Sequence, residues 1–251
     1  KQFGDFSSNL ALVLSKEFSK PPKDIAEMLL KELGEKDFID RMEIAGPGFI
    51  NFFLSHESRT EILKTINKEK NKFGFSTKKT IEKDSVLIEY VSSNPTGPLH
   101  VGHGRGAAFG SVLASILRAT GHQVDEEYYV NDQGRQTEIL SLSVWLRYLE
   151  IFNQVSLFPN NCYQGAYIES LAKELKKDKD NEFCVDQENE KEISQMLSSD
   201  LTEEELDNLI AKSKEVLKKG FEEIKTFALK NILQTIKGDL KAFGVEHNKW
   251  F

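Results

Sequence analysis

The 251-residue sequence is poor in cysteine and has no long apolar run. Its two cysteines, Cys162 and Cys184, lack metal-ligand partners at a useful spacing, which favours structural thiols in a reduced, cytoplasmic protein. No stretch reaches the roughly 18 apolar residues that a membrane-spanning helix needs, so we expect no membrane partner. The chain begins without methionine or a signal-peptide pattern, and we expect residues before Lys1 to have been removed.

Several patterns that mark well-known enzyme sites are also missing. The sequence contains neither a Walker-type phosphate loop nor a dinucleotide-binding G-x-G-x-x-G fingerprint. It offers no persuasive Ser-His-Asp or Cys-His arrangement for covalent catalysis. These absences favour a reaction in which the protein positions its substrates and stabilises charge, without supplying a nucleophile of its own.

Positive charge is scarce as well, since the net charge is -7. Residues 1–80 hold 14 basic and 12 acidic side chains, whereas residues 81–251 hold 19 and 28. This balance argues against binding of nucleic acid through bulk positive charge. It does not exclude a local basic surface that binds nucleic acid. An RNA partner would more plausibly meet the first part of the chain than the second.

The first part of the sequence has the pattern of a small α+β unit. Apolar residues at helical spacing predict helices over 9–18 and 25–33, and two strands over 38–44 and 49–54 flank the turn Gly46-Pro47-Gly48. A third helix is expected over 58–72, with Ile62, Leu63 and Ile66 facing inward. The polar stretch Ser76–Asp84 is the expected linker.

The second part alternates between strands and helices and then becomes helical. Strands are expected over 86–91 and 124–130, and helices over 105–120 and 133–150, which makes a βαβ unit with a parallel sheet. Beyond Phe158 we expect no further strand and a mobile loop over 176–192. The expected helices there cover 165–177, 190–197 and 203–243.

The residues that carry chemistry lie between the first of these strands and the helix that follows it. Ligands bind at such strand ends in open α/β sheets, and a helix N-terminus favours phosphate. His100 and His103 are three residues apart and so share one side of a helical turn, where both can donate hydrogen bonds to phosphate. Gly102 between them lets a base or ribose approach the backbone. The two histidines could instead be incidental or bind metal, but no acidic or cysteine partner is nearby.

A longer segment around the histidines resembles the first ATP-binding motif of bacterial arginyl-tRNA synthetases. This signature consists of Ser93, Asn94, Pro95, Thr96, Gly97, Pro98, Leu99, His100, Val101, Gly102 and His103. Further similarity lies in residues 3–9, 46–52, 126–134, 163–168 and 243–251. The sequence departs from the family pattern at Gln133 and Arg135, which leaves the role of that turn open.

The resemblance implies an arginine–tRNA ligase of class I, which activates L-arginine with ATP and transfers it to an arginine-accepting tRNA. It implies that His100 and His103 are catalytic, that ATP is bound with Mg²⁺ as its counter-ion, and that no dedicated metal site exists. The implied ATP-binding residues are Pro98, His100, Gly102 and His103. The implied arginine-binding residues are Glu89 and Asn94, and the implied tRNA-binding residues are Phe49 and Asn51.

The same resemblance implies a division into two domains. Residues 1–78 would form the family's additional N-terminal α+β domain, which contacts the tRNA D-loop. Residues 79–251 would form the first half of a Rossmann-like catalytic domain, with a helical insertion at about 160–240. Because the second half and its second basic signature are missing, we expect an N-terminal fragment of a cytoplasmic monomer, inactive on its own.

Two other functions are compatible with parts of this pattern. A small adenylyltransferase could use the same histidine pair, but it would need neither the N-terminal unit nor the helices after Phe158. A non-enzymatic RNA-binding module would need only the N-terminal unit, docked on a tRNA loop. For Glu89, Asn94 and Phe49 the simpler readings are a solvent-facing strand residue, a turn residue and a core residue.

Overall fold

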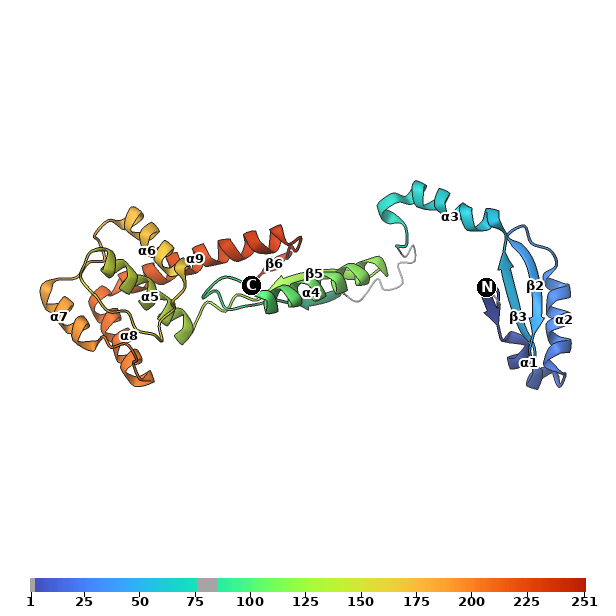
Figure 1. Ribbon diagram of the computed structural model, residues 1–251, viewed down its shortest axis with the longest axis horizontal. Helices are drawn as coiled ribbons and strands as arrows, with labels where there is room; N and C mark the ends of the chain where they lie inside the picture. The colour runs from blue at the N-terminus through green and yellow to red at the C-terminus, as the bar shows by residue number, and fades with distance from the viewer. Residues whose placement is uncertain (1–2, 76–84) are drawn as a thin grey trace. The chain divides into compact units, whose positions relative to one another are not determined.

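The computed structural model describes residues 3–75 and 85–251, which belong to two compact units, Lys1–Phe75 and Ser76–Phe251 (Figure 1). The expected linker Ser76–Asp84 and the expected domain boundary between residues 78 and 79 lie outside the described residues. No helix within the described ranges is long and apolar enough to cross a membrane.

The first unit is a three-stranded antiparallel sheet with two helices against one of its faces. The order of the strands is β1-β3-β2. The elements are β1 (Phe6–Ser8), α1 (Leu10–Phe18), α2 (Pro22–Leu33), β2 (Ile39–Ala45), β3 (Phe49–Leu54), α3 (His56–Glu69) and a 3₁₀ turn (Lys70–Lys72). The predicted helices and strands are confirmed, and β1 is an additional strand that three residues could not reveal in the sequence.

The core of this unit lies between the helices and one face of the sheet. Ala11 and Ala26 from the helices meet Ile50 of β3, and Phe52 packs against the same cluster. Because strand side chains alternate, Phe49, Asn51 and Phe53 belong to the opposite face of β3.

The prediction that Ile62, Leu63 and Ile66 face inward is wrong within this unit. The three side chains are 38% to 56% exposed, and no residue of α3 is buried. Helical spacing predicts an apolar stripe correctly, but burial also needs a partner surface, and α1 and α2 already cover the core of the unit.

The second unit combines a parallel sheet with a helical bundle, as expected for a Rossmann-like half followed by an insertion. The strands β4, β5 and β6 lie in that order, all parallel. The elements are β4 (Ser85–Glu89), α4 (Val101–Ala119), β5 (Gln123–Tyr128), α5 (Arg135–Ile151), α6 (Ala166–Lys179), α7 (Gln187–Met196), α8 (Glu203–Leu217), α9 (Lys219–Ala242) and β6 (Lys249–Trp250).

Helix α5 is the centre of the bundle and packs against α6, α8 and α9 (Figure 1). Its side chains are buried around most of its circumference, with Trp145 fully inside and its indole N–H donating to the carbonyl of Phe183 at 3.0 Å. Tyr90 and Tyr128 belong to the same core cluster, so the end of the sheet and the bundle share one core.

The structure corrects two predictions for this unit. A strand does follow Phe158, because β6 pairs with the end of β5 through Glu127–Lys249 and Tyr128–Trp250. The expected mobile loop over 176–192 is wrong as well: it contains the ends of α6 and α7, and Phe183 between them is 4% exposed. Its backbone is tied to α5, since the Trp145 indole N–H donates to Phe183 O at 3.0 Å. It is also tied to the residues just after α5, since the Gln154 amide donates to Val185 O at 2.6 Å.

Candidate active site

The candidate site begins where β4 ends. Within the described residues β4 pairs with β5 alone, and β6 lies beyond β5. This succession matches the first half of a doubly wound sheet, in which the ligand crevice lies at the carboxyl end of the first strand, beside the point where the strand order reverses. The connection from Glu89 to His100 leaves β4 at that end and leads into α4.

The two histidines cap the N-terminus of α4 with their rings. His100 is the N-cap residue, and its Nδ1 accepts the backbone N–H of Gly102 at 3.1 Å. His103 Nδ1 accepts the backbone N–H of His100 at 3.2 Å, which closes a reciprocal capping box. The helix therefore starts at Val101, four residues earlier than predicted, because imidazole nitrogens do here what serine or aspartate oxygens usually do.

This capping fixes the protonation pattern of both rings. A neutral imidazole whose Nδ1 accepts a hydrogen bond carries its proton on Nε2, so each ring keeps an Nε2–H donor for a ligand. The rings are stacked, with centroids 3.8 Å apart and planes 19° from parallel. Burial, and secondly the neighbouring His100, lower the pKa of His103, which keeps that ring neutral at neutral pH.

Gly102 allows this arrangement. A Cβ at this position would lie 2.9 Å from Cε1 of His100 and 3.0 Å from its Nδ1, closer than side-chain atoms normally approach. Pro98 is exposed two residues before the cap. The N-terminus of α4 therefore offers the two Nε2–H donors of His100 and His103 together with the positive end of a 19-residue helix. This combination is suited to phosphate.

The backbone that connects β4 to the signature is strained. Val91 and Ser92 have φ values of 69° and 39°, in the left-handed region that β-branched residues in particular avoid. Such residues cost about 1–3 kcal/mol each and persist where the surroundings over-determine them. Here the Ser92 hydroxyl accepts the backbone N–H of Tyr129 at 3.0 Å.

Two aromatic side chains hold the residues on either side of this strained pair. The Tyr128 hydroxyl accepts the Ser93 N–H at 3.1 Å and donates to the Ser93 carbonyl at 3.0 Å. His247 Nε2 lies 3.2 Å from the Tyr90 carbonyl and its ring lies 4.2 Å from the Tyr90 ring. Burial lowers the pKa of His247, so the neutral ring donates through Nε2. Both residues pre-organise the connection without belonging to the signature.

A buried network of charged and polar side chains holds Tyr90, the residue that follows β4. The Tyr90 hydroxyl donates to Glu126 Oε2 at 2.5 Å, and Arg118 in the last turn of α4 pairs with Glu126 Oε1 at 2.5 Å. Asn248 Oδ1 accepts the backbone N–H of Glu126 at 3.0 Å. Sequence reasoning missed this network, although an acidic residue between Val124 and Tyr128 on the buried face of β5 signals the need for a partner.

The two predicted arginine-binding residues have different surroundings. Glu89 is exposed at the end of β4, and its carboxylate makes no hydrogen bond or ion pair with the described residues. Asn94 is held by the turn before α5: its Nδ2 donates to Gln136 Oε1 at 2.6 Å, and its Oδ1 accepts Asn131 Nδ2 at 3.1 Å. That turn therefore orients Asn94. Arg135, the departure from the family pattern, instead pairs with α8.

The predicted tRNA-binding residues lie in the other unit. Phe49 is 38% exposed at the start of β3. Asn51 is only 3% exposed, and its Oδ1 accepts the Ser7 hydroxyl at 2.7 Å. Its Nδ2 donates no hydrogen bond within the described part of the chain, and this atom keeps a small exposed surface. On this face of the sheet the Phe49 ring is thus accessible, whereas the Asn51 amide is almost completely buried.

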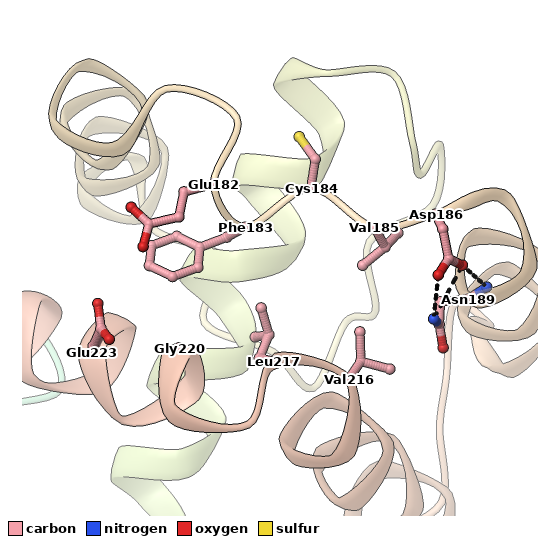
Figure 2. A pocket seen from close by; sticks show the side chains of 10 residues that line it. All are labelled: Glu182, Phe183, Cys184, Val185, Asp186, Asn189, Val216, Leu217, Gly220 and Glu223. Carbon is pink, nitrogen blue, oxygen red and sulfur yellow. Dashed lines mark hydrogen bonds between the residues drawn. The ribbon is translucent and has the colours of Figure 1, made fainter.

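The remaining cavities and charged clusters do not coincide with these residues. A cavity of about 280 Å³ lies between the Glu182–Asn189 segment and the junction of α8 and α9, and contains none of the predicted site residues (Figure 2). Among the described residues, no three His, Cys, Asp or Glu side chains are grouped to hold a metal ion.

Two protein-family models together match most of the chain. The model of the arginyl tRNA synthetase N-terminal domain matches residues 1–54, and that of the catalytic domain of tRNA synthetases class I (R) matches residues 63–238. The chain is 43% identical over 267 residues to an arginine–tRNA ligase of Acinetobacter baumannii (strain AYE), and 44% identical over 256 residues to that of Legionella pneumophila (strain Corby). These alignments cover 100% and 99% of this chain but 44% and 42% of the relatives.

A solved structure supports the same relationship. A protein of Campylobacter jejuni assigned to the arginyl-tRNA synthetases superposes with a TM-score of 0.58 at 31% identity, over 79% of this chain and 36% of that one. The chain thus spans less than half the length of the proteins it matches. Since the class I catalytic model covers residues 63–238, the chain belongs to the arginyl-tRNA synthetase family of class I.

Proposed function

We propose that the protein joins L-arginine to an arginine-accepting tRNA. In the first step, a carboxylate oxygen of arginine attacks the α-phosphorus of ATP, the bond to the β-phosphate oxygen breaks, and pyrophosphate leaves with arginyl-adenylate formed. In the second, a terminal ribose hydroxyl of the tRNA attacks the arginyl carbonyl carbon and AMP leaves. The observation that carries this proposal is the pair of free Nε2–H donors at the α4 N-terminus, next to the end of β4.

The described residues can be given roles in the first step. His100 and His103 would donate to the phosphate oxygens as negative charge shifts toward the leaving pyrophosphate, while Mg²⁺ enters with ATP as its counter-ion. Pro98 and Gly102 would line the nucleotide side. Glu89, whose carboxylate lacks a partner among the described residues, would bind a cationic group of arginine.

The two units would share the substrates. Residues 1–78 would bind the tRNA D-loop through Phe49 and Asn51, and residues 79–251, with the helical insertion at about 160–240, would belong to the catalytic domain. We further propose a monomer in the cytoplasm, with no membrane partner and no dedicated metal site.

The proposed reaction is tested by exchange of labelled pyrophosphate into ATP. The full-length protein is expected to catalyse exchange that depends on arginine and tRNA, and lysine should not replace arginine, whereas residues 1–251 alone are expected to show no exchange. Glu89→Gln should raise KM for arginine about 10- to 100-fold with KM for ATP unchanged, because one charge-assisted contact is lost. Glu204→Gln, an exposed change on α8, is the control. Exchange with another amino acid, or with none, would refute the proposal.

The proposed tRNA contact is tested by binding measurements. Phe49→Ala should weaken binding of the arginine-accepting tRNA about tenfold, because stacking on one base is lost. The factor should stay constant as salt is raised, since stacking releases no counterions, although overall affinity falls. Phe18→Ala removes a ring that is even more exposed, at 56%, from α1, outside the sheet face, and should leave binding unchanged. Equal effects of the two changes would contradict the assignment.

A further inference from the structure

A side chain of the helical insertion contacts the signature segment. Tyr167, in the first turn of α6, donates from its hydroxyl to the backbone carbonyl of Thr96 at 2.7 Å. Thr96 lies four residues before the His100 cap, in the middle of the connection between β4 and α4. Tyr167 is neither a predicted site residue nor part of the capping box.

Two glycines lie close against the Tyr167 side chain. A Cβ at Gly97 of the signature would lie 3.1 Å from the Tyr167 hydroxyl oxygen and 3.3 Å from Cζ. A Cβ at Gly165, the N-cap of α6, would collide with the ring itself. The ring is thus seated between the signature backbone and the start of its own helix. Burial raises the pKa of Tyr167 to about 12, so its hydroxyl remains a donor at neutral pH.

This contact lies between two other anchored residues of the connection. Asn94 is anchored to the turn before α5, and His100 is anchored to α4 by its own capping bonds. Between them Thr96 N–H donates to the Asn94 carbonyl at 2.8 Å, a local bond that does not tie the segment to the rest of the fold. Tyr167 supplies that tie.

The other end of the contact is rigid. Ile168 and Ala172 of α6 are fully buried, and Leu171 is 6% exposed, in the core that α6 shares with α5 and α9. A helix packed in this way has few low-energy alternatives for its first turn. The hydrogen bond from Tyr167 therefore fixes the Thr96 carbonyl relative to the helical bundle.

We propose that Tyr167 is a positioning residue that holds the signature segment, and with it the His100–His103 pair, in the geometry that receives the phosphates of ATP. This rests on the proposed function for the identity of the ligand. The positioning itself rests on the contact of Tyr167 with Thr96 and on the two glycines around the ring. The helical insertion thereby becomes part of the nucleotide site, although none of its side chains need touch the nucleotide.

The first test needs no activity. Hydrogen exchange of backbone amides is compared in the protein, in Tyr167→Phe, which removes only the hydroxyl, and in Tyr163→Phe. Tyr163 is half-buried and close in sequence, and its hydroxyl makes no hydrogen bond within the described residues. Tyr167→Phe should speed exchange over residues 96–103 about 5- to 10-fold, as the loss of one hydrogen bond implies, and Tyr163→Phe should not. Unchanged exchange in Tyr167→Phe overturns the proposal.

The second test measures whether Tyr167→Phe changes KM for ATP. In pyrophosphate exchange by the intact protein, Tyr167→Phe should raise KM for ATP about 5- to 10-fold and leave KM for arginine unchanged, a split that general destabilisation would not produce. An active Tyr167→Phe protein with unchanged KM for ATP also overturns the proposal. If the full-length protein without substitutions shows no exchange with arginine, the proposed function fails, and the amide exchange alone decides whether Tyr167 positions the segment.

Discussion

Replacing His100 by alanine is expected to lower kcat/KM for ATP in pyrophosphate exchange by about 100-fold or more, the cost of removing a pre-organised donor to developing charge. The change removes the Nε2–H donor directly. It also removes the stacking partner of His103 at 3.8 Å and leaves the Gly102 N–H without its acceptor. Pyrophosphate exchange with varied ATP is the measurement.

His100→Asn separates the two roles of this histidine. Asparagine is among the best N-cap residues, so His100→Asn should keep the stability that His100→Ala loses, about 1 kcal/mol. Both changes should reduce activity, because the shorter amide does not reproduce the reach of Nε2–H. His122→Ala, just beyond the other end of α4, is the control and should retain full activity. A His100→Ala protein within twofold of normal activity would exclude phosphate binding by this pair.

Gly110→Ala is expected to destabilise the second unit by about 2–3 kcal/mol, despite the better helix propensity of alanine. Gly110 is where α4 packs on the end of β4, and a Cβ there would lie 2.7 Å from Cδ1 of Tyr90 and closer still to Cγ. Tyr90 would have to move and would then lose its bond to Glu126, leaving a buried carboxylate with Arg118 as its remaining side-chain partner.

Gly106→Ala provides the matched comparison, since it lies one turn earlier on α4 and a Cβ there would meet no atom within 4 Å. This change should stabilise the protein by about 0.5–1 kcal/mol, because alanine loses less backbone entropy in a helix than glycine. Urea unfolding, followed by circular dichroism, measures both differences. Equal effects at Gly110 and Gly106 would show that the close contact with Tyr90 does not limit the packing.

The sequence was sufficient for the order of the large elements and for the strand-to-helix junction at which the candidate site is proposed. The apolar run before Tyr90 and the glycines after it identify a strand followed by a helix, whatever the rest of the chain does. Helical spacing similarly located α1, α2 and α5. These features are local, and local patterns are what periodicity reports.

The features that the sequence did not predict mostly depend on contacts between residues far apart in the chain. Strand β6 is two residues long and is defined by its pairing with Glu127 and Tyr128. Two residues are too few to show the alternation that predicts a strand. The left-handed backbone at Val91 contradicts the preference of valine and is held by contacts from Tyr128 and His247 to its neighbours. The early start of α4 depends on histidine as a cap, a role that composition rules assign to other residues.

The hydrogen bond between His247 and the Tyr90 carbonyl also joins two parts of the chain that the ribosome makes at different times. The two residues are 157 positions apart in the chain. At synthesis rates of about 5–20 residues per second, the ribosome makes Tyr90 roughly 8–30 s before His247. Until then the Val91–Ser92 turn lacks one of its restraints and is free to relax toward ordinary backbone angles. A nascent chain would therefore acquire the histidine-bearing helix early and the geometry of the strand end that faces it late.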